Sequence, residues 1–221
     1  QFYCSIPMQN IKLSILLLIQ VFVFAPANAM SGIYQNEYQR PVSVVDGLVS
    51  NEVNCMLQDS KGFMWYGTNN GLCRYDAYTF KHYKLNYQHP HFFTNNTIRS
   101  LAEDQSGCLW VGTLKGLNRI DLQTGEVVNF NYEIINRSGV NSIAITNDNT
   151  PYFGTTNGLF YYDRAKNDFV QITSDNRGRE FKSVTIRSLF IDSKNYMWIG
   201  AWDTGYDVYN LNTNLFADYP Y

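Results

Sequence analysis

The residues Trp65-Tyr-Gly-Thr-Asn-Asn-Gly-Leu-Cys-Arg-Tyr-Asp76 return almost unchanged as Trp110-Val-Gly-Thr-Leu-Lys-Gly-Leu-Asn-Arg-Ile-Asp121. Two weaker copies follow at 152–163 and 198–210. The aromatic residues that open the four copies lie 45, 42 and 46 residues apart. A period of this length is typical of a unit of four strands, and it exceeds the roughly 33–34 residues of ankyrin and tetratricopeptide repeats. The sequence therefore predicts an array of one repeated structural unit.

Strands, not helices, fill each repeat. Apolar residues between the copies alternate with a period of two, and no helical period appears. The first strand of each repeat is expected at Val53–Asp59, Ile98–Asp104, Val140–Thr146 and Ile186–Asp192. A turn that needs a positive φ angle follows three residues later, where only Gly or Asn occurs: Gly62, Gly107, Asn149 and Asn195. We predict an all-β fold, a β-propeller of four-stranded antiparallel blades. About four blades are present, near residues 48–83, 96–130, 138–172 and 184–219.

An aromatic ring and two glycines mark the second and third strands of every repeat. These residues are Trp65, Gly67 and Gly71, then Trp110, Gly112 and Gly116, then Tyr152, Gly154 and Gly158, and finally Trp198, Gly200 and Gly205. A row of rings could bind sugars, and spaced glycines could cradle phosphate. However, features that recur in every repeat usually serve blade stacking, and no helix follows the glycines. We therefore interpret all twelve as structural.

The composition excludes several classes of protein. The chain has 221 residues, 45% of them hydrophobic, and a net charge of -2. No basic stripe is visible, so we expect no nucleic-acid partner. Cys55, Cys73 and Cys108 are widely spaced and do not resemble a disulfide framework or a zinc site. His89 and His91 lack a third ligand at suitable spacing, so neither a metal nor a cofactor is predicted.

The first 29 residues have the layout of a targeting segment. Lys12 precedes an apolar run from Leu13 to Ala25, and a small-x-small cleavage site ends at Ala29. The run is too short for a membrane helix, which needs about 20 residues. We interpret residues 1–29 as upstream residues followed by a cleaved secretory signal peptide, so that residues 30–221 form an exported domain.

The opening repeat resembles a known family. Asp46-Gly-Leu-Val-Ser-Asn-Glu-Val53, Gln58-Asp-Ser-Lys-Gly-Phe-Met-Trp-Tyr-Gly-Thr68 and Gly71-Leu-Cys-Arg-Tyr-Asp76 are similar to two-component regulator propeller repeats. Proteins with this opening are mostly hybrid two-component sensors. In these proteins two seven-bladed periplasmic propellers and a β-sandwich precede a membrane helix, a histidine kinase and a receiver.

The resemblance carries further expectations. It implies a periplasmic domain of a parent in the inner membrane, an oligosaccharide ligand, and a homodimer in the full-length protein. Four blades are fewer than a seven-bladed ring needs, so we expect this chain to be a fragment whose partners include the remaining blades and the kinase of the same parent. In the full-length protein a strand near Ile33–Val45 is expected to close the first propeller against its last blade, and in this chain that strand is expected to have no partner.

Departures from the repeat supply the candidate ligand residues. The fourth repeat inserts one residue in its second turn and places Trp202 beside Asp203, which could stack on a sugar ring and accept hydroxyl hydrogen bonds. Arg99 and Arg187 share one strand position with Asn54 and Asn141 and could bind the carboxylates or sulfates of an acidic glycan. A turn variant and solvated strand positions are the structural alternatives for these residues.

No catalytic carboxylate pair and no Ser-His-Asp pattern can be recognised, so no catalysis is expected in this segment. The leading hypothesis is a fragment of the periplasmic, carbohydrate-responsive sensor of a hybrid two-component system. Two alternatives stay open: a secreted propeller enzyme such as a polysaccharide lyase or glycosidase, and the propeller sensor of a diguanylate cyclase.

Overall fold

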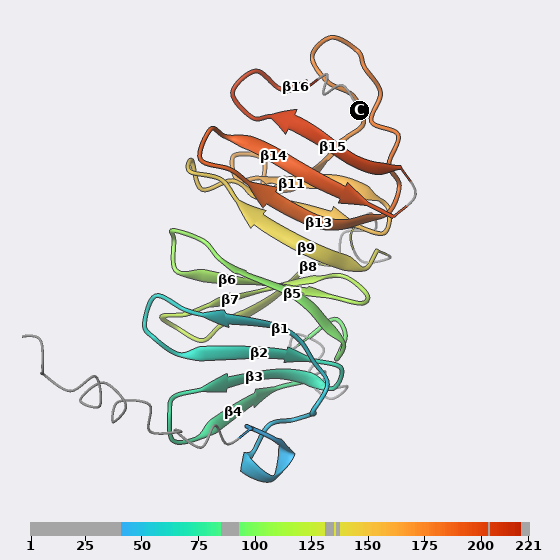
Figure 1. The fold of residues 1–221 in the computed structure, drawn as a ribbon. Coiled ribbons are helices and arrows are strands. Elements are labelled where there is room, and N and C mark those ends of the chain that lie inside the picture. Colours follow the sequence, from blue (N-terminus) through green and yellow to red (C-terminus); the bar gives the residue numbers. More distant parts are fainter. Residues whose placement is uncertain (1–40, 85–92, 131–134, 136–137, 203, 218–221) are drawn as a thin grey trace, which may run out of the picture. The chain divides into compact units, whose positions relative to one another are not determined.

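Four antiparallel sheets follow one another along the chain in a computed structural model, which describes residues 41–84, 93–130, 135, 138–202 and 204–217. Each sheet takes its four strands from consecutive sequence, as predicted (Figure 1). The first sheet contains β1 (Val53–Gln58), β2 (Met64–Thr68), β3 (Gly71–Tyr75) and β4 (Phe80–Tyr83). The second contains β5 (Ile98–Glu103), β6 (Cys108–Thr113), β7 (Leu117–Asp121) and β8 (Val127–Phe130).

The third and fourth sheets repeat this order. The third contains β9 (Val140–Ile145), β10 (Pro151–Thr155), β11 (Gly158–Asp163) and β12 (Asp168–Ile172). The fourth contains β13 (Ile186–Ile191), β14 (Tyr196–Ala201), β15 (Gly205–Asn210) and β16 (Leu215–Phe216). The four sheets are blades of an all-β propeller, and they do not close into a ring. The predicted fold class is therefore confirmed.

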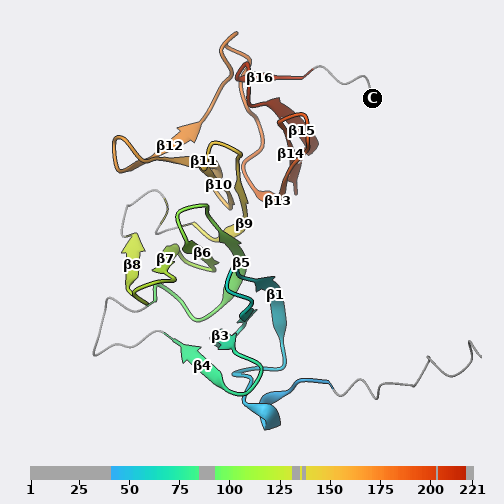
Figure 2. The ribbon, with the colours of Figure 1, turned by 90° about the vertical axis from the view of Figure 1, so that its left-hand side faces the viewer.

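The first strand of each blade contacts the first strand of the next: β1 with β5, β5 with β9, and β9 with β13. Figure 2 shows these inner strands in succession, with the outer strands β4, β8 and β12 farther away. Each blade is therefore packed face to face against its neighbour along the chain.

Alternation of side chains along β6 shows how a blade serves two cores. Leu109 and Val111 belong to an apolar cluster shared with the first blade, which also contains Trp65. Trp110, between them, belongs to a cluster shared with the third blade, which contains Phe153. All three β6 residues are fully buried. Because successive side chains in a strand point to opposite faces, a strand that lies between two neighbours becomes apolar on both sides.

The predicted turns have the predicted backbone. Gly62, Gly107, Asn149 and Asn195 all have positive φ angles, of 87°, 75°, 66° and 67°. Only Gly tolerates this region without cost, and Asn tolerates it better than other residues. The restriction to these two residues in the sequence is thereby explained.

Two strand predictions differ from the structure at their ends. The strand expected near Ile33–Val45 in the full-length protein lies mostly outside the described residues, and at its end Val44–Asp46 make one turn of 3-10 helix. Ser43 and Asp46 cap this turn reciprocally, which favours a helical turn over an extended chain. The fourth outer strand was expected to end near Tyr219, but β16 ends at Phe216. Tyr219 and the predicted signal peptide lie outside the described residues.

Candidate functional site

Each inner strand has a β-bulge near its start. The candidate residues Arg99 and Arg187 lie at these bulges. The pairing register slips between the first and third residues of β1, β5 and β13, and β9 shows the same irregularity opposite Gly154 and Thr155. The residues skipped by the register are Asn54, Arg99, Asn141 and Arg187. Bulges re-aim a side chain away from the ladder. We call these four residues the bulge row.

The bulge row links successive blades. The Asn54 side-chain amide donates to the carbonyl oxygen of Ile98 at 2.8 Å, and the Asn141 amide donates to that of Ile186 at 2.7 Å. The Arg99 guanidinium donates to Asn141 Oδ1 at 2.5 Å. Each of these bonds joins one inner strand to the next, so three members of the row also have a structural role.

Arg99 and Arg187 lie close enough to interact electrostatically. Partial burial lowers the pKa of Arg99, and the positive charge of Arg187 lowers it further. Arginine nevertheless stays protonated in proteins, so both side chains carry a charge. Within the ranges that the structure describes, no carboxylate forms an ion pair with either residue. The two arginines therefore form a local positive centre that no carboxylate among the described residues neutralises.

Trp202 completes this region. The Arg187 guanidinium lies over the Trp202 ring, 4.4 Å from its centroid, and Trp202 is 74% exposed. An exposed ring beside the Arg187 cation can offer a face to a ligand while the cation binds an anionic group. The structure thus brings Arg99, Arg187 and Trp202 together, whereas Asp203 lies outside the described residues.

The turn that carries Trp202 differs from its counterparts in one further residue. In the first three blades a buried threonine accepts a backbone bond within the turn and donates to a glycine carbonyl: Thr68 to Gly71, Thr113 to Gly116 and Thr155 to Gly158. The fourth blade has Ala201 there, and the pairing of Ala201 with Gly205 leaves a turn of three residues instead of two. The insertion read in the sequence is therefore present in the structure.

A second group of polar residues holds the turn between the first and second strands of a blade, a role that was not predicted from the sequence. Asp59, Asp104 and Asp192 each follow an inner strand and accept an indole hydrogen bond. The Nε1 to Oδ2 distances are 2.7 Å for Trp65, 2.8 Å for Trp110 and 3.1 Å for Trp198. The other carboxylate oxygen accepts two backbone N–H groups of the turn. The constant spacing between Asp and Trp in three of the repeats could have been used to predict this hydrogen bond.

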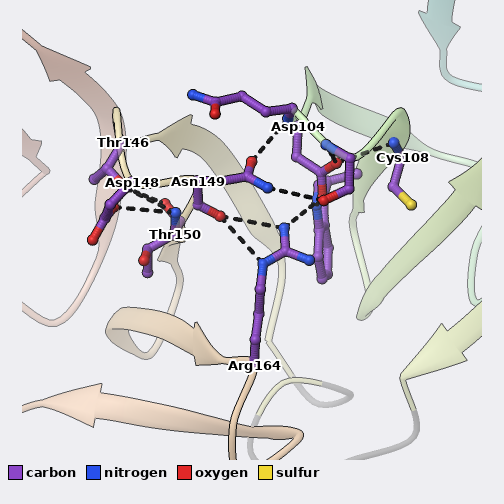
Figure 3. A network of polar contacts seen from close by, with 10 residues as sticks. Asp104, Cys108, Thr146, Asp148, Asn149, Thr150 and Arg164 are labelled. Atoms are coloured by element: carbon purple, nitrogen blue, oxygen red, sulfur yellow. Dashed lines mark hydrogen bonds and ion pairs between the residues drawn. The ribbon is translucent and has the colours of Figure 1, made fainter.

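Asp104 also joins two blades. Arg164 of the third blade donates to Asp104 Oδ2 at 2.7 Å and to the carbonyl oxygen of Asn149 (Figure 3). Burial alone would raise the pKa of Asp104, but hydrogen bonds from Arg164, Trp110 and the Cys108 backbone hold it below its usual range. The carboxylate is buried and fully bonded, which identifies it as structural.

The repeated rings and glycines lie within the blades. Trp65 and Trp110 are buried, whereas Tyr152 and Trp198 are half-buried. A Cβ atom on Gly112 would lie 2.7 Å from the Val140 carbonyl oxygen of the next blade, and one on Gly67 would lie 2.7 Å from an Ile98 side-chain carbon. Gly71, Gly116, Gly158 and Gly205 close the second turn of each blade. These glycines allow adjacent blades and strands to approach closely.

Cysteine and histidine residues form no ligand cluster in the described ranges. Cys55, Cys73 and Cys108 are free thiols, and burial raises the pKa of Cys55 to about 12. No group of three potential metal ligands occurs among the residues that the structure describes. His89 and His91 lie outside them.

Comparison with known proteins connects this architecture to a family. The family model of the two component regulator propeller matches residues 47–70 and 93–115, so these segments are repeats of that kind. No curated protein matches the sequence significantly. No helix in the described ranges has the length and apolar character of a membrane span.

Solved extracellular domains from B. thetaiotaomicron share the fold. One belongs to a one component system and is 26% identical, with a TM-score of 0.63 over 73% of this chain and 22% of its own. A second structure of that same protein, described there as a hybrid two component system, is 24% identical with a TM-score of 0.63, and the domain of another hybrid two component system is 21% identical with a TM-score of 0.70. They are covered to 24% and 26% of their lengths, for 79% and 82% of this chain. The chain therefore spans about a quarter of the extracellular domains that it matches.

Proposed function

Because residues 47–70 and 93–115 are two component regulator propeller repeats, we propose that the chain is part of the exported sensor region of a hybrid two-component system. The observation that supports this proposal most directly is the combination of these repeats with the fold of solved extracellular domains. The segment contributes ligand sensing and no catalysis. The parent is a histidine kinase of the inner membrane, with this region in the periplasm.

The ligand of this proposal is an oligosaccharide. Two cations near each other repel, so an anionic group placed between Arg99 and Arg187 would remove that repulsion. The exposed face of Trp202 offers a stacking surface for a sugar ring next to it. Together these features favour a carboxylated or sulfated sugar, with Asp203 as a further acceptor for hydroxyl groups.

Signalling in the parent would follow a shift between two arrangements of a homodimer. A ligand that binds one arrangement more tightly raises its population, and the membrane helices would pass that bias to the kinase. The remaining blades of the same parent would close the propeller to seven blades.

The genomic DNA beyond the codon for Tyr221 tests the parent architecture. We expect an open reading frame that continues into further propeller repeats, a membrane helix and a histidine kinase. A stop codon directly after Tyr221 contradicts the proposal. A continuation into a cyclase domain would instead support a propeller sensor with another output.

Binding of an acidic sugar tests the proposed ligand site at Arg187 and Trp202. Calorimetry with trigalacturonate should give a salt-sensitive affinity that falls at least tenfold in Arg187→Ala and in Trp202→Ala. Arg177→Ala, which removes a cation elsewhere, should leave the affinity unchanged. Equal weakening by Arg187→Ala and Arg177→Ala would show a general charge effect, and an unchanged affinity in Trp202→Ala would show that the ring does not contact the sugar; either result would contradict a specific site.

A further inference from the structure

The third blade lacks an arrangement of side chains that the first two blades share. In the first two blades an Asp–Trp hydrogen bond is flanked by an arginine, since Trp65 pairs across strands with Arg74 and Trp110 with Arg119. The third blade has Thr146 at the Asp position, and Tyr152 pairs there with Tyr161. Thr146 instead bonds within its own turn, accepting from Thr150 N and donating to Asp148 Oδ1.

A cavity of about 480 Å³ opens beside this tyrosine pair, between the third and fourth blades. Its wall takes side chains from β10, β11 and β12 on one side, and from β15 and the turn after it on the other. The side chains that form it include Tyr152, Tyr161, Gln171, Asn176, Tyr209 and Asn214. This volume lies within the roughly 300–1,000 Å³ of small-molecule sites. The cavity is separate from the bulge row, which lies near the start of the inner strands.

Three phenol groups at this cavity have no partner in the part of the chain that the structure describes. Within these ranges the hydroxyls of Tyr152, Tyr161 and Tyr209 make no hydrogen bond. Tyr209 is only 5% exposed as a residue, but its hydroxyl is not among the buried polar atoms without a partner, so it opens into the cavity, where water or a ligand can bond to it. Burial raises the pKa of Tyr152, and the neighbouring Tyr209 and Asp148 raise it further, so the phenol stays protonated and can donate.

The wall is polar but nearly uncharged. Besides the tyrosines it presents amide groups of Gln171, Asn176 and Asn214, and its one acid is Asp148. Asp148 already accepts hydrogen bonds from Thr146 and Thr150, which lower its pKa, so it is an anion at neutral pH. A negative charge disfavours an anionic ligand, and the wall contains no cation that would attract one.

The rings add a preference for shape. Tyr152 and Tyr161 lie with centroids 5.6 Å apart and planes inclined by 34°. Such faces attract the C–H groups of a saturated ring, while phenol and amide groups exchange hydrogen bonds with hydroxyls around it. We propose that this cavity between the third and fourth blades, lined by Tyr152, Tyr161 and Tyr209, is a binding site for an uncharged, hydroxyl-rich ring such as one neutral sugar unit.

Tyrosine-labelled protein tests this site directly. The purified chain, with 13C in its tyrosine rings, is titrated with glucose, galactose, mannose, xylose and arabinose, and ring signals are followed by NMR. At least one sugar is expected to move the signals of Tyr152, Tyr161 and Tyr209 saturably. Tyr152→Phe keeps the ring but removes the hydroxyl, and it should weaken that binding about fivefold to tenfold. Tyr78→Phe, far from the cavity in an exposed turn, should have no effect.

A second variant fills the cavity instead of removing a bond. Thr146→Asp combined with Tyr152→Trp restores the pair of the first two blades, so the chain should stay folded and lose sugar binding. The proposal is overturned if no sugar moves these signals, or if this double variant still binds. Because the acidic sugar test depends on Arg187 and Trp202, either site can fail without the other.

Discussion

Asp104 accepts four hydrogen bonds from two successive blades. Ser106 N, Cys108 N and Trp110 Nε1 belong to its own blade, and Arg164 reaches it from the next. The carboxylate is fully buried, so each of these donors would lose its acceptor if the side chain were removed. This single residue therefore supports a turn, an indole orientation and a contact between blades.

Asp104→Ala should lower the free energy of unfolding by about 3 kcal/mol, because it removes the charged acceptor of the turn N–H groups and of the buried Trp110 indole. Asp192 is the matched control, because it makes the same turn and indole bonds but has no arginine partner in the described ranges. Trp198 is half-buried, so water can replace its acceptor, and Asp192→Ala should cost clearly less. Urea unfolding followed by tryptophan fluorescence measures both. Equal losses would contradict a special role for the Arg164 contact.

The acid dependence of stability should report the same carboxylate. Its pKa is lowered in the folded state, so its ionised form stabilises the fold above the unfolded value of about 3.9. That contribution is lost as the pH falls below this value and through the folded pKa. The difference in unfolding free energy between the wild-type chain and Asp104→Asn should stay constant from about pH 7 to 5 and shrink below about pH 4. A difference independent of pH would mean that the charge of Asp104 is not responsible.

At the scale of the strand, β6 requires a residue without a side chain at Gly112. A Cβ atom there would lie 2.1 Å from Ser100 Oγ and 2.7 Å from the Val140 carbonyl oxygen. The second contact is with the backbone of another blade, which cannot rotate away. Gly112→Ala should therefore destabilise the chain by about 3 kcal/mol, at the upper end of ordinary overpacking.

Gly107 provides the control for this prediction. It has a positive φ of 75°, a Cβ atom added to it would meet nothing within 4 Å, and Asn occupies the equivalent turns at Asn149 and Asn195. Gly107→Asn should therefore change the unfolding free energy by less than about 1 kcal/mol. Thermal unfolding of both variants distinguishes a need for space from a need for conformational freedom. Comparable losses in the two would contradict this distinction.

The sequence predicted these strands better than it predicted their contacts. Repetition fixed the inner strands to within one residue, because Gly62 and its equivalents mark the following turn. The bonds of the bulge row were not foreseeable, since Asn54 bonds to the backbone carbonyl of Ile98, a group that every residue has. Nothing in the local pattern identifies that partner.

The cavity could not be predicted from the sequence for a related reason. Tyr152 was recognised as a variant of the repeated tryptophan, but Tyr209 belongs to another repeat and reaches the same space only through blade packing. β16 likewise contacts a group distant in sequence, because Phe216 N donates to Asp175 Oδ2 in the segment that links the third and fourth blades. Such contacts follow from the arrangement of blades and not from the periodicity within one.

For the molecule as a whole, each core lies between two blades. Leu57 pairs with Trp65 and faces the second blade, and the corresponding Phe190 pairs with Trp198 in the fourth. Phe190 is 65% exposed, whereas Leu57 belongs to an apolar cluster. On the opposite face of the first blade Met56 is 64% exposed, although its equivalents Leu101, Ile143 and Leu189 pack into the cores between blades. The described part of the chain thus has an exposed apolar residue on each of its two end blades, Met56 on the first and Phe190 on the fourth.

In the parent the faces that carry these residues would contact the remaining blades, so the 221-residue chain expressed on its own should associate head to tail, the fourth blade of one copy against the first blade of another. Such heterologous contacts can continue from copy to copy. Sedimentation velocity should show mass rising with concentration. Phe190→Glu should weaken the association about tenfold or more, because a carboxylate buried without a partner is costly. Tyr78→Glu changes a 91% exposed ring in the turn between β3 and β4 and should leave association unchanged. A chain that stays monomeric at every concentration, or equal effects of both substitutions, would show that the Phe190 face does not pair with the Met56 face.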